Sequence, residues 1–294
     1  MAAQHKSLDQ QVIVITGASS GIGLATAILA AERGATLMLL ARSQEALKDI
    51  RRDLGKTGAS VDIVCLDVAD RAAVEAAAAD CMQRHGRIDT WVNNAGASIY
   101  ARLEEGTEED HRRLFDTNFW GVVNGSLVAL PYLRKSGGAL VNLGSELSEA
   151  VIPLQGMYCA SKHAVKGFTD ALRVEVEAID DAGVTITLIQ PTAVNTPYPQ
   201  HARNYMEREP KLPEPQIDPF QVASAILEAA PPGGRDVKVG TMATVDVAVA
   251  QLMPRLGDVF AAMQARRQQQ DRPPVDPIGN LHRPTEDARV HGRP

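Results

Sequence analysis

Residues 12–23 of the chain read Val-Ile-Val-Ile-Thr-Gly-Ala-Ser-Ser-Gly-Ile-Gly. The first five form a continuous apolar or β-branched run, which predicts a buried β-strand. Gly17, Gly21 and Gly23 follow directly and open an apolar segment with helical spacing, 22–33. In such a strand–loop–helix unit, backbone N–H groups and the helix N-terminus can hold a pyrophosphate, and glycine allows its close approach. The stretch therefore predicts a dinucleotide site, with a plain tight turn as the alternative.

Strands and helices are predicted to alternate along the rest of the chain. Short apolar runs predict further strands at 36–40, 61–66, 88–93, 139–143, 184–189 and 237–239. Helical spacing marks 45–56, 72–85, 108–133 and 158–179. Strands that are apolar on both faces, joined by helical crossovers, are typical of parallel sheets. We therefore predict an α/β fold, a doubly wound Rossmann-type parallel sheet of about seven strands with helices on both faces.

Residues 8–266 are predicted to form one domain that carries both the cofactor site and the catalytic site. Its last helix has an apolar stripe over 245–263, interrupted at Pro254, which favours core or subunit packing over a membrane surface. Five prolines interrupt the alternation of strands and helices at 196–217. This segment could be a lid over a site or a stiff connection on the surface. Residues 267–294 are rich in Arg, Gln and Pro without aromatics, which predicts a flexible tail.

Composition narrows the class of protein. The chain has 294 residues, 45% of them hydrophobic, and a formal net charge of −6, so there is no basic surplus for nucleic acid and a small-molecule partner is expected. Cys65, Cys81 and Cys159 fit neither a zinc ribbon nor a disulfide framework, so we predict no metal site and a reducing, cytoplasmic location. The amino terminus is polar and no stretch has the length and apolarity of a transmembrane segment.

The end of the second predicted strand bears on the choice of cofactor. A unit that prefers NAD would place an acidic residue there against the ribose 2′-hydroxyl, but this chain has Arg42. A guanidinium can pair with a 2′-phosphate, so NADP(H) is favoured over NAD(H). The alternative is an arginine that only faces solvent.

Tyr158 and Lys162 are four residues apart on a predicted helix, so their side chains share a face. A neighbouring ammonium favours the phenolate, and we expect Lys162 to lower the pKa of Tyr158 towards neutrality. Ser145 follows a predicted strand, at the edge where open α/β sheets bind ligands. A hydroxyl, a phenol and an ammonium together can move a proton while a cofactor carries hydride, which predicts an oxidoreductase.

These residues together resemble the short-chain dehydrogenase/reductase family over about residues 10–240. The matching positions are Thr16 to Gly23, Asp67, Val68, Asn93 to Gly96, Asn118, Ser145, Tyr158, Lys162, Pro191, Val194 and Thr196.

The resemblance implies a role for each position. Tyr158 would be the acid/base, Ser145 would orient the substrate oxygen, Lys162 would also hold the nicotinamide ribose, and Asn118 would anchor a proton-relaying water. The implied cofactor-binding set is Gly17, Ser19, Ser20, Gly21, Ile22, Gly23, Arg42, Asp67, Val68, Asn94, Ala95, Gly96, Tyr158, Lys162, Pro191, Val194 and Thr196. Asp67 and Asn118 could instead simply cap helices.

Three positions depart from the family pattern. Thr192 stands where glycine usually follows the proline, which would narrow the nicotinamide pocket. Ser20 is not the basic residue of many NADP-preferring relatives, so the preference rests on Arg42. Gly144 replaces a common serine before Ser145 and should only loosen the loop.

The resulting prediction is an NADP(H)-dependent dehydrogenase/reductase that interconverts an alcohol and a carbonyl; a nucleotide-binding regulatory or scaffold protein without turnover is the alternative. Apolar residues between Ser145 and Tyr158 suggest a hydrophobic substrate, while Glu146 and Glu149 face either solvent or a polar substrate group. Relatives assemble through two long helices, here 108–133 and 158–179, so the resemblance implies a homodimer or homotetramer.

Overall fold

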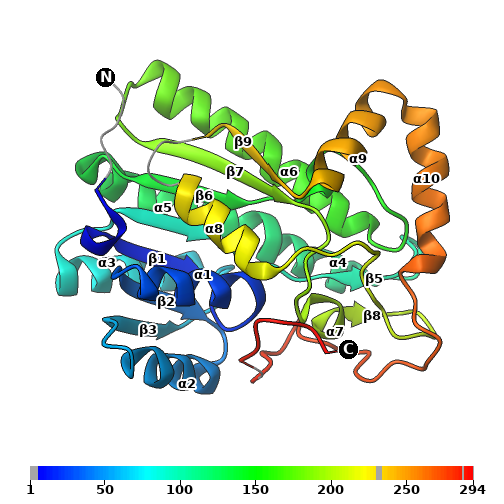
Figure 1. Cartoon of the computed structure of the whole chain (residues 1–294), viewed down its shortest axis with the longest axis horizontal. Helices are drawn as coiled ribbons and strands as arrows, with labels where there is room; N and C mark the ends of the chain where they lie inside the picture. The colour runs from blue at the N-terminus through cyan, green and yellow to red at the C-terminus, as the bar shows by residue number, and fades with distance from the viewer. Residues whose placement is uncertain (1–5, 230–233, 287, 294) are drawn as a thin grey trace.

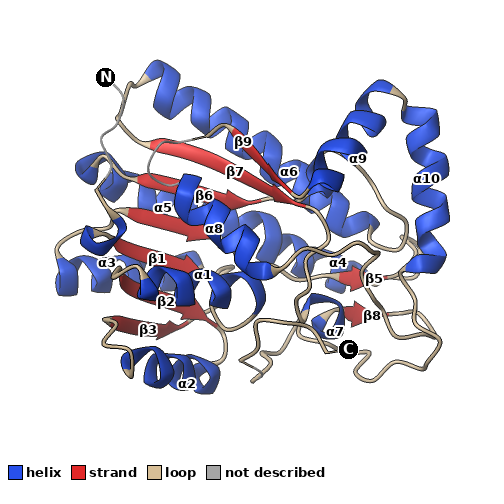
Figure 2. Cartoon of the chain, viewed as in Figure 1, coloured by secondary structure: helices blue, strands red, loops and turns tan. Residues whose placement is uncertain are grey.

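The structure is a computed structural model that describes residues 6–229, 234–286 and 288–293. In these residues, seven strands form one parallel sheet (Figure 2). Across the sheet the order is β3 (Val61–Cys65), β2 (Thr36–Ala41), β1 (Val12–Thr16), β4 (Thr90–Asn93), β6 (Ala139–Leu143), β7 (Thr185–Pro191) and β9 (Asp236–Val239). The predicted doubly wound parallel sheet is confirmed.

Helices cover both faces of the sheet because its strands are apolar on both sides. In Figure 1, α1 (Gly21–Glu32) and α8 (Pro219–Ala229) lie in front of the sheet, and α5 (Gly121–Ser136) and α6 (Gly156–Arg173) lie behind it. One buried cluster joins α1, α2 (Gln44–Gly55) and α8 to alternate strand residues such as Ile13 and Leu37. The second cluster joins α3 (Arg71–His85), α5 and α6 to the strand residues between these, such as Val14 and Met38, whose side chains point to the other face of the sheet.

Strand order sets the position of the site. The chain moves outwards from β1 to β2 and β3, then returns past β1 to form β4. Loops at the carboxyl ends of β1 and β4 therefore diverge and leave a crevice between them, where open α/β sheets bind ligands. The loops after β6 and β7 end at the same edge, because the strands run parallel.

Two predicted helices are longer than expected and contain π turns. The predicted helix at 108–133 is α4 (Glu108–Phe115), a π turn at Asp116–Trp120 and α5, in continuous succession. The helix predicted at 158–179 begins earlier, as α6, and ends in a π turn at Val174–Ile179. Such turns tilt the following side chains, and the first of them contains Asn118.

The segment at 196–217 has structure of its own. It contains α7 (Tyr198–His201) and β8 (Arg203–Asn204), and β8 pairs in parallel with β5 (Ile99–Tyr100) beyond the end of the main sheet. Both lie at the carboxyl edge of the strands in Figure 1.

The last helices stand beside the sheet rather than in its core. The predicted break at Pro254 separates α9 (Thr241–Leu252) from α10 (Pro254–Arg267). The expected core packing is wrong for most of the stripe, because Leu252 and Val259 are 80% and 56% exposed. Subunit packing of this face stays a prediction.

Within the described ranges, no helix combines the length and the apolarity needed to cross a membrane.

Composition predicts a tail that does not order itself from residue 267 onwards, whereas the structure packs the described part of this segment on the domain. Leu281 is fully buried and Gln268 is fully buried as well.

Candidate active site

The loop between β1 and α1 is shaped by its glycines. Gly17 has φ 65°, and a Cβ there would lie 2.6 Å from Cα of Ala95. A Cβ on Gly23 would lie 2.3 Å from the carbonyl oxygen of Gly17. Asn94 donates its side-chain N–H to the carbonyl oxygen of Gly17 at 3.1 Å. The loop is thus packed against the chain after β4 with no room for side chains at either glycine.

The N-terminus of α1 opens on the crevice without a side-chain cap. Ser20 is the N-cap residue, but its hydroxyl accepts no N–H from the first turn. Ser19, Ser20 and Ile22 line the cavity that lies in front of the helix. The N–H of Gly21 is donated to the carbonyl oxygen of Arg289 at 2.8 Å. N–H groups at a helix start attract anions, so this part of the cavity fits the pyrophosphate of a dinucleotide.

Charged side chains gather at the far end of the cavity, beyond β2 and β3. Arg42 donates to the carbonyl oxygens of Asn280 and Leu281, in the latter case at 3.0 Å. Arg113 forms an ion pair with Asp67. Burial, and then the neighbouring Arg113 cation, lower the pKa of Arg42. This group has two guanidinium cations and one carboxylate, so it has a net positive charge and can bind an anion.

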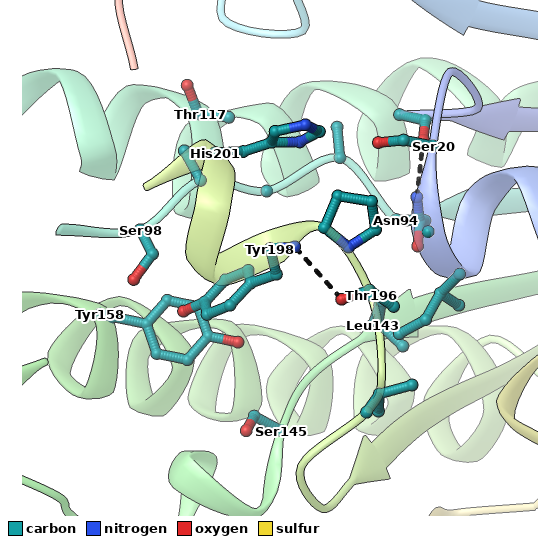
Figure 3. Close-up of a pocket in the computed structure, with 18 of the residues that line it drawn as sticks. Ser20, Asn94, Ser98, Thr117, Leu143, Ser145, Tyr158, Thr196, Tyr198 and His201 are labelled. Carbon is teal, nitrogen blue, oxygen red and sulfur yellow. Dashed lines mark hydrogen bonds between the residues drawn. The ribbon is translucent and has the colours of Figure 1, made fainter. Parts of the chain in front are cut away.

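The opposite end of the cavity holds the predicted catalytic residues (Figure 3). Ser145 comes directly after the loop that follows β6, and Tyr158 and Lys162 come from the first turns of α6. Ser145 and Tyr158 line the same end of the cavity, where the Ser145 hydroxyl favours the ionised form of the Tyr158 phenol. Lys162 is buried, donates from Nζ to the carbonyl oxygen of Leu143 at 2.7 Å, and lies 5.6 Å from the centre of the Tyr158 ring.

The pKa of Tyr158 differs from the expectation based on spacing. Burial raises the pKa of Tyr158, and hydrogen bonds with Ser145 and Tyr198 only partly oppose that rise. Burial also lowers the pKa of Lys162 to about 8. The lysine points at a carbonyl oxygen rather than at the phenol, so it does not move Tyr158 towards neutrality here as predicted.

Most of the predicted site residues meet in this one cavity, of about 240 Å³. It is lined by Gly17, Ser19, Ser20, Gly21, Ile22, Arg42, Asp67, Val68, Asn94, Ala95, Gly96, Ser145, Tyr158, Lys162, Pro191, Val194 and Thr196. Gly23 and Asn118 do not line it. Gly23 lies behind the loop, where its lack of a side chain permits the contact with Gly17.

Asn118 lies behind the cavity wall, in the π turn. Its side chain accepts from the backbone N–H of Ala97 at 2.8 Å and donates to the carbonyl oxygen of Ala97 at 3.0 Å. It also donates to the Ser161 hydroxyl at 3.1 Å. Asn118 therefore fastens α6 and the segment after β4 to each other, and its implied role in holding a water stays a prediction.

The comparison with known proteins now decides the family. Residues 11–207 match the family described as short chain dehydrogenase. The chain belongs to the short-chain dehydrogenase family. This dehydrogenase is 42% identical to the uncharacterized oxidoreductase YxnA of Bacillus subtilis, over 86% of this chain and 72% of that one. It is 36% identical to the 3-ketodihydrosphingosine reductase of Bacteroides thetaiotaomicron, over 68% of this chain and 70% of that one.

Solved structures of short-chain dehydrogenases agree. An alcohol dehydrogenase of Thermococcus sibiricus, in complex with 5-hydroxy-NADP, has a TM-score of 0.67 and 29% identity, covering 78% of this chain and 94% of its own. A short-chain dehydrogenase/reductase of Burkholderia phymatum, in complex with NAD, has a TM-score of 0.77 and 26% identity, covering 93% and 99%. The resemblance seen in the motifs is confirmed, and the chain is an oxidoreductase that acts on CH–OH or C=O groups.

The cavity of this dehydrogenase also contains residues that the sequence did not single out. Tyr198 packs edge-on against Tyr158, with ring centres 5.5 Å apart, and donates its hydroxyl to Gln155 at 3.0 Å. His201, Leu212 and Pro213 line the same cavity. All but Gln155 lie in the proline-rich segment at 196–217. The prolines of this segment suggested that it could cover a site, but their spacing did not show which of its side chains point into the cavity.

Glu146 belongs to the cavity rather than to the solvent-facing surface. Its Oε2 is buried and has no hydrogen-bond partner in the described residues. Burial, with Asp246 nearby, raises the pKa of Glu146 to about 7. Glu149 points elsewhere and accepts from Gln190 at 2.9 Å. Of the two acids, only Glu146 lines the cavity, beside Ser145.

Proposed function

We propose that this dehydrogenase interconverts an alcohol and a carbonyl with NADP(H) as its cofactor. The observation that carries the proposal is that Ser145, Tyr158 and Lys162 line the same cavity as the glycine loop and Arg42. When bound, the nicotinamide cofactor supplies or accepts hydride. The residues of this chain bind and orient the reactants and move the proton.

Ser145 is oriented by the backbone. Its Oγ accepts the N–H of Leu147 at 3.1 Å, and its own N–H is donated to the Ser148 hydroxyl at 3.1 Å. With a backbone donor on its oxygen, the Ser145 hydroxyl can direct its hydrogen at charge that develops on the substrate oxygen.

Tyr158 is the group that exchanges the proton with that oxygen. It lines the cavity with Ser145, and its ring packs against that of Tyr198. Tyr198 in turn is held by Gln155, which donates to Gln268 at 2.7 Å. This chain of side chains sets the direction of the phenol. Because burial raises its pKa, Tyr158 is protonated in the free protein at neutral pH, which suits an acid that acts in carbonyl reduction.

Charge at the other end of the cavity supports NADP(H) over NAD(H). Arg42 has no carboxylate partner of its own in the described residues, because Asp67 is paired with Arg113. A 2′-phosphate would supply the missing negative charge. The two solved structures described above contain one cofactor of each kind, so they do not decide between them.

A hydrophobic substrate is supported by the lining near Ser145. Leu147, Ile152, Leu212 and Pro213 contribute apolar surface to that end of the cavity. The name of the Bacteroides relative describes the reduction of a keto compound, which also supports a carbonyl substrate. Val151, by contrast, is 57% exposed and contributes nothing to the cavity.

We also propose that the protein is a homodimer or homotetramer assembled through α4, α5 and α6. Along these helices Trp120 and Val174 are 52% and 48% exposed, which is large for apolar side chains. Burying them against a second copy would stabilise the assembly.

Tyr158→Phe tests the catalytic assignment. We expect NADPH to bind with unchanged affinity, measured by its own fluorescence, while turnover on a panel of apolar ketones and alcohols falls by about 10²- to 10⁴-fold. Tyr132→Phe is the matched control, because Tyr132 lies on α5 away from the cavity and should keep parental turnover. Parental turnover in Tyr158→Phe would refute the assignment. NADPH binding by the parent without turnover on any substrate would favour a regulatory protein.

A further inference from the structure

The segment that follows α10 crosses the carboxyl edge of the sheet. We call its described residues, 268–286 and 288–293, the C-terminal strap. In Figure 1 the red end of the chain lies between α7 and the carboxyl ends of β2 and β3. Its contacts reach from Asp110 on α4 to the start of α1. The strap therefore spans the cofactor end of the cavity from one side to the other.

One buried side chain and one ion pair anchor the middle of the strap. Leu281 has no exposed surface and packs in an apolar cluster with Ala97 and Leu114. Next to it, His282 contacts Oδ1 of Asp110 through Nε2 at 2.7 Å. Burial of the whole leucine side chain removes apolar surface from water and so stabilises the docked position of the strap.

The backbone of the strap is fitted to the domain as well. Gly279 has φ 59°, and a Cβ there would lie 2.4 Å from the carbonyl oxygen of Ala202. Asn280 donates its N–H to the carbonyl oxygen of His201 at 2.7 Å. Further on, Gly21 donates its N–H to the carbonyl oxygen of Arg289 at 2.8 Å. The strap thus contacts both α7 and the glycine loop.

The strap lies at the rim of the cavity and does not fill it. Asn280, Pro284 and Thr285 line the same cavity as the glycine loop, Arg42 and Asp67. The cavity of about 240 Å³ is continuous from these residues to Tyr158 with the strap in its observed position. The strap therefore forms one side of the cavity and does not block it, since a blocking segment would separate the Arg42 end from the Tyr158 end.

The strap also orients Arg42. The carbonyl oxygens of Asn280 and Leu281 accept one N–H each from Nη2 and Nη1. A guanidinium has five N–H donors, so three stay available for an anion in the cavity. Because a guanidinium held at two points has fewer rotamers left to lose, it binds a phosphate at a smaller entropic cost.

We propose that the C-terminal strap is the outer wall of the cofactor groove, which positions Arg42 and encloses the adenosine end of the bound dinucleotide. The inference rests on the proposed function in that the ligand is NADPH. A nucleotide enclosed in this way leaves only when the strap moves. The strap therefore sets the rate of NADPH release and contributes to NADPH affinity.

Leu281→Ala tests the proposal, with Ile278→Ala as its matched control. Both changes shorten an aliphatic side chain of the strap, but Ile278 is 53% exposed whereas Leu281 is buried. We expect NADPH dissociation in stopped-flow displacement to be at least about tenfold faster in Leu281→Ala, with a correspondingly higher Kd. Ile278→Ala should match the parent.

Hydrogen exchange on the parent protein gives a readout that does not depend on folding of a variant. We expect NADPH to slow exchange of strap amides at 277–285 together with those of the glycine loop. NADPH protection confined to the glycine loop, or NADPH affinity that is unchanged or tighter in Leu281→Ala, would overturn the inference and leave the proposed function intact. A parent protein that binds neither NADPH nor NADH would refute the proposed function itself, and the strap as a cofactor wall with it.

Discussion

Arg42→Ala is the most direct test of cofactor choice. The guanidinium has three N–H donors left after its bonds to Asn280 and Leu281, and Asp67 is paired with Arg113. A hydrogen bond to a charged group contributes about 1.5–3 kcal/mol, and Arg113 would retain part of the local positive charge. We take about 2–3 kcal/mol for the loss on NADPH binding. At about 1.4 kcal/mol for each factor of ten, the Kd for NADPH rises about 30- to 150-fold.

The assay is a titration of parent and variant with NADPH and with NADH, followed by nucleotide fluorescence at low and high salt. NADH lacks the 2′-phosphate, so its Kd should change by less than about threefold, and the difference for NADPH should shrink as salt screens the charges. Arg33→Ala is the control, because Arg33 is exposed at the end of α1 and its guanidinium donates to the Ser224 hydroxyl, away from the cavity. If the Kd values for NADPH and NADH change by the same factor, Arg42 does not recognise the 2′-phosphate and the argument for NADP fails.

Three further predictions concern stability and assembly. Since burial raises the pKa of Glu146 to about 7, above the usual value of about 4.3, its protonated form stabilises the fold and that contribution is lost as pH rises through about 7. Between pH 5 and pH 8, the free energy of unfolding of Glu146→Gln in urea should therefore fall less than that of the parent, and the difference should be no more than about 4 kcal/mol. If the unfolding free energies of variant and parent change with pH in parallel, this prediction is wrong. The side chain of Asn142 accepts a hydrogen bond from Asn93 and donates one to Thr169, so Asn142→Ala should lower the free energy of unfolding by about 2–4 kcal/mol. The control Asn195→Ala, at an exposed position, should lower it by less than about 0.5 kcal/mol. Equal losses in the two variants would mean that these two hydrogen bonds do not stabilise the fold. Trp120→Glu should reduce the mass in light scattering from an oligomer to a single chain, and a parent of single-chain mass would end that proposal.

Much of the fold could be predicted because its signals are local. All seven strands of the main sheet were predicted within two residues at either end, since a strand buried on both faces must be continuously apolar. The small β5–β8 pair was missed, because two-residue strands carry no pattern. For the exposed face of α9 and α10 the sequence predicted core or subunit packing, and the exposure excludes the core for most of it, because an apolar stripe does not say whether the same chain covers it.

The candidate site divides in the same way. The residues of the glycine loop, Ser145, Tyr158 and Lys162 were identified from spacing, and the fold brings them to one cavity. Tyr198 and Gln155 were not, because Tyr198 contacts Tyr158 and Gln155 from a segment at least forty residues further along the chain. The direction of the pKa shift of Tyr158 was also beyond the sequence, since it depends on how much water the surrounding chain excludes.

The sequence by itself determined the parallel α/β fold, and it predicted the glycine loop and the group Ser145, Tyr158 and Lys162, because hydrophobic periodicity, glycine and helical spacing act over a few residues. Only the tertiary structure decided what surrounds them. It turned a polar C-terminal segment into a wall of the cavity and placed the carboxylate of Glu146 inside. Composition predicts whether a segment can form a core alone, but a single leucine can dock on a cluster that other segments have already built. Such docking depends on contacts between distant residues, which no local pattern contains.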